Sequence, residues 1–249
     1  MSRFVLACLF IAATSFISTA NSAMIAQPDI GKVVTFIFTA DKNGDLNRDS
    51  KNNPIPYGTG FFVLIQNEAG SSGGHGYLVT DKHVLKDQQG TPFSKIFIRV
   101  NKLSGDAEFD ALDLVSNGQS VVYTHPDPTV DIAVIPAIPD PTIYDLKTVP
   151  AEWLATKDLP GIGEGADVFF VGLFTTYYGE RQNVPLFRFG RIAMLPADRI
   201  SWQDKQDAPP DAVELYLLET QTYGGNSGSP VFFKPDILQY GNTPHHLKS

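Results

Sequence analysis

The stretch Gly225-Asn226-Ser227-Gly228-Ser229-Pro230, near the C-terminus, decides how this chain is interpreted. A tight turn flanked by glycines can expose the hydroxyl of Ser227 while it directs backbone N–H groups at the same point. Acyl transfer needs this combination, namely a nucleophile and hydrogen-bond donors about 3 Å from the place where the tetrahedral oxyanion forms. A loop rich in Gly and Ser is not sufficient alone, so the chain must also supply a base and a residue that orients the base.

Both of these groups are present upstream of the glycine-rich turn. His83 follows an apolar strand in Thr80-Asp81-Lys82-His83-Val84, and Asp131 lies inside another apolar run, Val130-Asp131-Ile132-Ala133-Val134. The intervening stretches are long enough to cross several strands, so the three residues could meet only at a junction of the whole fold. The order His, Asp, Ser differs from the subtilisin and α/β-hydrolase orders. The hydrolase elbow Gly-x-Ser-x-Gly is also absent, because Ser229 occupies the place of its second glycine.

At these residues the chain resembles the chymotrypsin-like serine peptidases, and within them the bacterial branch that includes glutamyl endopeptidases and HtrA-type proteases. The resemblance extends from about residue 33 to residue 233, and it is carried by four pieces in the right order: 58–62, 78–84, 131–134 and 225–230. It implies an all-β fold of two six-stranded β-barrels with the active site in the cleft between them.

The resemblance also implies a division of the chain into domains. The N-terminal barrel would comprise 30–135 and carry His83 and Asp131, and the second would comprise 146–249 and carry Ser227. The Pro-rich start of 136–145 marks the linker between them. A strand of the Gly-Ile type, which family members carry after the nucleophile, is not recognisable here. We therefore expect the second barrel to be incomplete at its C-terminus.

Apolar and β-branched runs recur at short intervals and are bounded by Gly, Pro, Asn and Asp. This pattern, without long helical periodicity, favours a barrel or a sandwich. The predicted strands are 33–38, 60–65, 76–80, 95–100, 167–172, 187–192 and 213–218.

The composition is that of a compact domain, with 43% hydrophobic and 18% charged residues among 249. The formal net charge is −8, and the sequence shows no run of basic residues of the kind that binds the phosphates of a nucleic acid. We therefore predict no nucleic-acid partner. No cofactor and no metal site are predicted either. Cys8 is the only cysteine and lies in the leader, so the mature chain has no disulfide, which favours the bacterial branch.

Residues 1–23 are interpreted as a signal peptide. Arg3 supplies a positive start, residues 4–17 are apolar, and Ala20-Asn21-Ser22-Ala23 offers small residues for cleavage. The apolar run is short for a membrane anchor and no stop-transfer charges follow it. We therefore expect a secreted or periplasmic protein without membrane attachment after cleavage.

The resemblance assigns each member of the triad a role. Ser227 would be the nucleophile, His83 the general base and Asp131 the residue that orients the imidazole, while the backbone N–H groups of Gly225 and Ser227 would form the oxyanion hole. Taken singly, each side chain has a plainer interpretation, such as a Gly-Ser turn, a surface carboxylate or a hydrogen-bonded core histidine. Their order and spacing together favour the triad.

The residues before the nucleophile, Gln221, Thr222 and Tyr223, should line part of the substrate pocket. In glutamyl endopeptidases a Thr or Ser at the position of Thr222 helps to hold the substrate carboxylate, which suggests cleavage after Glu or Asp. Asn226 replaces the aspartate of animal members that pairs with a newly cut N-terminus, so we expect no activation switch of that kind.

The predicted function is therefore a secreted serine endopeptidase that acts on protein or peptide substrates through an acyl-enzyme intermediate. The alternative is a non-catalytic binding protein, or a truncated fragment, on the same fold. The oligomeric state is left open by these patterns.

Overall fold

A computed structural model describes residues 10–12, 27–67, 73–156, 159, 161–196, 199–202 and 211–233. Within these ranges there is no α-helix, and the helical segments are the short 3₁₀ turns η1 (Gln27–Lys32), η2 (Lys82–Leu85) and η3 (Ala151–Trp153). No helix in this described part of the chain is long and apolar enough to cross a bilayer. The expected all-β class is confirmed.

The larger sheet is built from the N-terminal half of the chain and follows the order β6-β5-β2-β3-β4-β10-β9, with β11 beside β3. All neighbours on this main path are antiparallel. Its strands are β2 (Val34–Thr39), β3 (Pro56–Gln66), β4 (Gly74–Thr80), β5 (Lys95–Asn101), β6 (Ala107–Asp113), β9 (Tyr123–Thr124), β10 (Ala133–Pro136) and β11 (Val149–Pro150). A small hairpin of β7 (Val115–Ser116) and β8 (Gln119–Ser120) follows β6.

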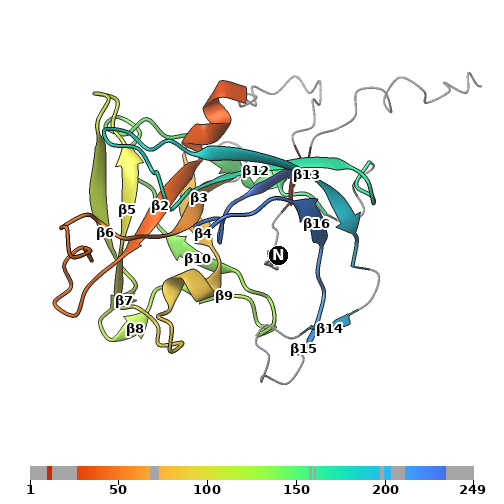
Figure 1. Ribbon diagram of the computed structural model, residues 1–249, viewed down its shortest axis with the longest axis horizontal. Helices are drawn as coiled ribbons and strands as arrows, with labels where there is room; N and C mark the ends of the chain where they lie inside the picture. Colours follow the sequence, from red (N-terminus) through yellow and green to blue (C-terminus); the bar gives the residue numbers. More distant parts are fainter. Residues whose placement is uncertain are drawn as a thin grey trace, which may run out of the picture.

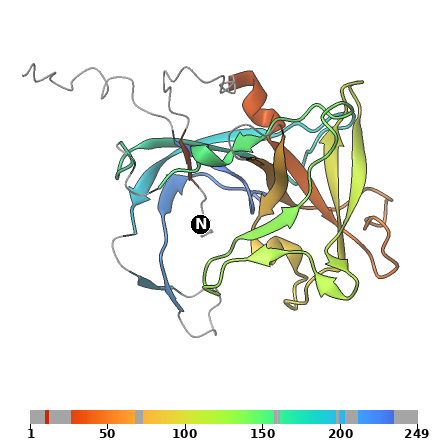
Figure 2. The same cartoon turned by 180° about the vertical axis from the view of Figure 1, so that it is seen from behind.

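The second sheet contains five strands in the order β1-β17-β12-β13-β16. They are β1 (Phe10–Ala12), β12 (Asp167–Gly172), β13 (Leu186–Met194), β16 (Leu217–Thr220) and β17 (Val231–Phe233), and a separate hairpin is formed by β14 (Ile200–Trp202) and β15 (Asp211–Val213). In Figure 1 the N-terminal strands lie on the left and β12, β13 and β16 on the right, and Figure 2 shows the same division from behind. This is the two-part, chymotrypsin-like architecture that the resemblance implied.

Strand β2 is buried along its whole length because its two faces serve different cores. Ile37 packs inside the N-terminal half with Phe62 and Leu78. Phe36 and Phe38 belong to a second cluster, which also contains residues from the other sheet. That shared cluster includes Phe169, Val171, Leu173 and Phe232.

Strand β12 repeats this arrangement from the other side of the junction. Phe169 and Val171 pack into the shared cluster, whereas Val168 and Phe170 pack inside the second half of the molecule. Each fully buried apolar side chain of this size contributes about 1.5–3 kcal/mol. The shared cluster therefore docks the two sheets firmly, and residues that lie along their junction are held in fixed relative positions.

All but the last of the predicted strands coincide with observed ones. The predicted strand 213–218 is instead divided between β15 and β16, because the chain changes partner there from β14 to β13. Asp131 lies just before β10 rather than inside a strand. The proposed boundaries 30–135, 136–145 and 146–249 stay predictions. Strand β11 lies in the last of these ranges but pairs with β3 of the larger sheet.

Candidate active site

His83 lies in η2, directly after the buried end of β4. The next two residues, Val84 and Leu85, are buried in the N-terminal core and anchor the turn. The imidazole is left at the surface, where its side chain is 54% exposed. The local sequence thus explains the position of His83. The apolar strand before it and the apolar residues after it are buried, so the polar imidazole is held at the surface between two fixed segments.

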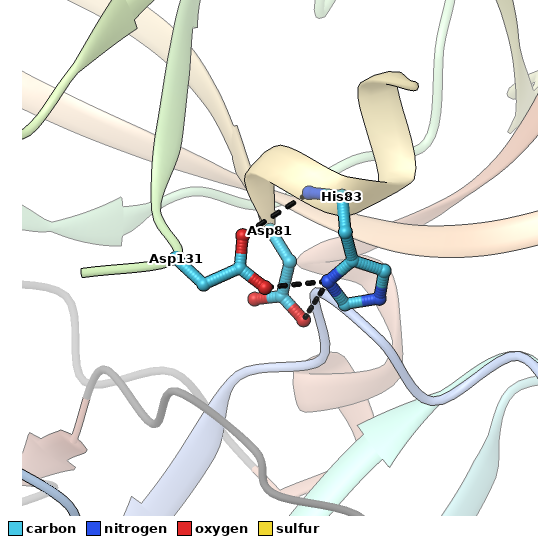
Figure 3. Close-up of side chains that lie close together, drawn as sticks. All are labelled: Asp81, His83 and Asp131. Carbon is cyan, nitrogen blue, oxygen red and sulfur yellow. Dashed lines mark hydrogen bonds and ion pairs between the residues drawn. The ribbon is translucent and has the colours of Figure 1, made fainter. Parts of the chain in front are cut away.

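Asp131 reaches His83 because β10 pairs with β4, with Ala133 opposite Thr80. Its Oδ1 accepts a hydrogen bond from the backbone N–H of His83 at 3.1 Å, and its Oδ2 lies 2.5 Å from the ring Nδ1 (Figure 3). Burial acts to raise the pKa of Asp131, but the hydrogen bonds and charge of His83 outweigh it and hold that pKa below its ordinary value. The ionised carboxylate therefore fixes the ring with Nδ1–H as the donor.

Ser227 lies in the turn between β16 and β17, and its Oγ is 2.8 Å from Nε2 of His83. With Nδ1 protonated, Nε2 is the acceptor for the serine hydroxyl. The turn closes through a bond from the N–H of Ser229 to the carbonyl of Asn226 at 2.9 Å. The three residues predicted as a triad are therefore joined in one continuous chain of hydrogen bonds, although they come from both halves of the molecule.

Thr59 on β3 holds the serine turn from the N-terminal side. Its N–H donates to the carbonyl of Ser227 at 2.8 Å, and its hydroxyl donates to the carbonyl of Gly225 at 2.7 Å. The same hydroxyl accepts the N–H of Leu173 at 2.9 Å. Thr59 lies in segment 58–62, which carries the family resemblance. No role was predicted for it, because its partners lie far away in the chain.

Two glycines of the turn have conformations that a side chain would oppose. Gly225 has φ +96° and Gly228 has φ +83°. A Cβ on Gly228 would lie 2.0 Å from the carbonyl oxygen of Thr59 and 2.3 Å from Oγ1 of Thr80. The close approach of β3 and β4 to the turn therefore requires a glycine directly after Ser227.

One protein family matches most of this architecture. Residues 58–235 match the family described as a trypsin-like peptidase domain, a range that includes His83, Asp131 and Ser227. The chain belongs to the trypsin-like peptidase domain family. As a peptidase-type domain it is classed with proteolytic hydrolases, and the predicted resemblance is confirmed.

Solved structures resemble this trypsin-like peptidase domain only distantly. A crystal structure of Deg5 is 15% identical with a TM-score of 0.46, covering 86% of this chain and 88% of that one. The apo protease domain of MamO from Magnetospirillum magneticum is 14% identical with a TM-score of 0.47, covering 82% and 79%. No curated protein matches the sequence.

Asp81 is a further carboxylate at the site of this trypsin-like peptidase domain, and no role was predicted for it. It is buried, its Oδ2 lies 4.0 Å from Nδ1 of His83, and burial raises its pKa to about 7. Asp81, His83 and Asp131 present possible metal-ligand atoms within 4.8 Å of one another. The contacts among the residues themselves account for this grouping, so we assign no metal to it.

The predicted substrate-pocket residues follow β16 directly. Gln221 and Tyr223 are exposed and Thr222 is half-buried. Tyr223 packs edge-on against Phe174, with the ring centroids 5.7 Å apart. On the inner side of Tyr223 lies Arg188, which sequence reasoning did not single out.

Arg188 is a buried cation in the second half of the trypsin-like peptidase domain. Its Cζ lies 5.2 Å from the ring of Tyr223 and 5.9 Å from that of Phe170. None of its nitrogens has a hydrogen-bond partner among the residues that the structure describes, and burial lowers its pKa. Such a group is costly to bury without an anion.

Asn226, which precedes Ser227, is buried, and within the described part of the chain neither polar atom of its side chain has a hydrogen-bond partner. The expectation that no N-terminal activation switch operates through this position stays a prediction. Gly225 and Ser227, the predicted oxyanion-hole residues, flank Asn226 in the same turn.

Proposed function

We propose that this trypsin-like peptidase domain is a secreted serine endopeptidase that hydrolyses peptide bonds through an acyl-enzyme intermediate. The observation that carries the proposal is the continuous contact from Asp131 through His83 to Ser227, at 2.5 and 2.8 Å. A serine alone is too weakly acidic to attack an amide, and a base within hydrogen-bond reach removes that limitation.

In the proposed reaction, Nε2 of His83 takes the hydroxyl proton as Oγ of Ser227 attacks the substrate carbonyl carbon. The N–H groups of Gly225 and Ser227 donate to the resulting oxyanion, and Asp131 stabilises the imidazolium. His83 then returns the proton to the leaving amine, and the amide C–N bond breaks to leave an acyl-serine. Water repeats the sequence with His83 as base and releases the acid.

Secretion belongs to the same proposal and is supported by the pattern of residues 1–23. Of these, 1–9 and 13–23 lie outside the described residues. Residues 10–12 form β1, which pairs in parallel with β17. Cleavage after residue 22 or 23 would remove β1 and leave that edge of β17 open.

We further propose protein or peptide substrates with Glu or Asp at the cleaved position. Thr222 supports this by its place before the nucleophile, and Arg188 supports it by supplying a buried cation without a hydrogen-bonded anion behind the ring of Tyr223. Profiling with a peptide library would test the preference. Cleavage mainly after Arg or Phe would overturn it.

Fluorophosphonate labelling of the purified mature chain, read by intact mass, tests the proposed chemistry. The probe reacts with an activated serine and needs little of the substrate cleft. We expect wild type to gain one adduct, Ser227→Ala to gain none, and Ser229→Ala, a serine of the same turn, to retain labelling. A folded wild type that is not labelled would favour the non-catalytic binding protein instead.

A further inference from the structure

Asp81 stands at the position where an aspartate ordinarily caps a helical turn, directly before η2. Its side chain makes no capping hydrogen bond there; only its backbone carbonyl accepts the N–H of Val84, at 3.1 Å. The side chain is only 6% exposed. A buried carboxylate that does not cap its own turn must gain its stabilisation elsewhere.

That stabilisation comes from the turn of the nucleophile, in the other half of the molecule. Oδ2 of Asp81 accepts the backbone N–H of Gly228 at 2.8 Å. The carbonyl of the same peptide unit, that of Ser227, accepts the N–H of Thr59 at 2.8 Å. The peptide that follows the nucleophile is therefore held at both of its polar atoms by the N-terminal half.

The same oxygen of Asp81 also faces the catalytic base. It lies 4.0 Å from Nδ1 of His83, while Asp131 makes the direct hydrogen bond to that nitrogen (Figure 3). The titratable groups that face Asp81 are His83 and Asp131, and the second half contributes the N–H of Gly228. The carboxylate of Asp81 therefore lies within electrostatic reach of His83 and is hydrogen-bonded to the residue that follows Ser227.

We propose, on the basis of the serine-peptidase function above, that Asp81 is a positioning residue that sets both the orientation of the nucleophile and the proton affinity of His83. Through Gly228 it fixes the peptide next to Ser227, so that Oγ stays in line with Nε2. When it is ionised, its carboxylate, 4.0 Å from Nδ1, favours the imidazolium form of His83.

The ionisation of Asp81 falls near neutral pH. Burial and the charge of Asp131 raise its pKa to about 7, against the opposing influence of His83 and Gly228. Asp81 and His83 therefore titrate as a pair, with the proton on one affecting the other. Asp81 carries its charge above about pH 7, and removing that charge should lower the pH at which His83 becomes protonated.

The test measures the second-order rate of fluorophosphonate labelling between pH 5 and 9 for three variants beside wild type. Asp81→Asn keeps the size and an acceptor oxygen but removes the charge, and Asp81→Ala removes both. Asp145→Asn is the matched control, because it removes a carboxylate that pairs with Lys32 outside this site.

We expect D81N to shift the acidic limb of the rate profile downward by up to about one pH unit, because Asp81 is only partly ionised in that range. D81A should lower the plateau rate about tenfold or more, since the nucleophile loses its anchor. D145N should match wild type in both respects. If D81A does not fold, the D81N profile decides alone.

An acidic limb that does not move in D81N, or that moves equally in D145N, would overturn the role of Asp81. So would a folded D81A with the plateau rate of wild type. Failure of wild type itself to react would instead overturn the serine-peptidase function, and the role of Asp81 with it.

Discussion

Thr59→Val replaces a hydroxyl that bridges three parts of the site with a methyl group of the same shape. The side chain is fully buried, and its hydroxyl bonds to the carbonyl of Gly225 and to the N–H of Leu173. The variant therefore leaves one acceptor and one donor without a partner at the junction of the two sheets. An unsatisfied buried polar group costs about 1–3 kcal/mol. Because Gly225 is only half-buried, we expect a total loss of about 2–4 kcal/mol in the free energy of unfolding.

Thr35→Val is the matched control. Thr35 is equally buried, and its hydroxyl donates to the carbonyl of Arg99 at 2.9 Å. That carbonyl also accepts the side-chain N–H of Asn183, so it keeps a partner when the hydroxyl is lost. We expect T35V to lose only about 1 kcal/mol, the net value of one hydrogen bond.

Urea denaturation of both variants and their rates of fluorophosphonate labelling provide the measurement. T59V should be less stable than T35V by about 1–3 kcal/mol. Its labelling rate should fall by up to about tenfold relative to wild type, because the carbonyl of Gly225 loses its hydrogen bond to Thr59. T35V should label as wild type does. Equal stabilities together with equal labelling rates would refute the idea that Thr59 holds the serine turn.

Two further predictions concern the buried ionisable groups. Arg188→Met should raise the free energy of unfolding by about 1 kcal/mol or more, because an apolar side chain replaces a buried cation without a hydrogen bond, and it should abolish any preference for acidic substrates. A loss of stability on thermal unfolding would instead indicate an anionic partner. The second prediction concerns D81N, which should gain stability relative to wild type as the pH rises from 4 to 8. The folded-state pKa of Asp81 is raised from 3.8 to about 7, so its contribution is present below pH 4 and is lost as the pH rises through 7. At about 1.4 kcal/mol per pKa unit the change is up to about 4 kcal/mol, and a constant difference in urea denaturation across that range would contradict it.

The sequence predicted the outline of the fold because the physical signals there are local. Val168 to Val171 is an uninterrupted apolar run, and Val33 to Phe38 is interrupted only by Thr35. The strands built from both runs are buried on both faces. An alternating pattern would have indicated one solvent-exposed face. The edge strand β6 was not predicted, because acidic residues separate its apolar residues in 107–113 and the strand is partly exposed.

The candidate site was predictable only in part, because sequence motifs are local and several of its contacts are not. His83, Asp131 and Ser227 stand in motifs whose order has meaning by itself. Asp81 and Thr59 lie inside the same motifs, but their roles depend on contacts with Gly228, Gly225 and Leu173, which lie more than a hundred residues away in the sequence. In the sequence, an aspartate that caps a helical turn cannot be distinguished from one that is buried against another segment. The difference depends on which backbone N–H the carboxylate accepts in the folded chain.

These contacts mean that docking of the two sheets and assembly of the site are one event. The hydrogen bonds that join the serine turn to Thr59 on β3 and to Asp81 cross the same junction as the shared core of Phe36, Phe38 and Phe169. A change that loosens this core would therefore separate Ser227 from His83 without altering either residue. Because the nucleophile and its base come from different halves, an isolated N-terminal half could retain the contact of His83 with Asp131 and still have no serine to activate.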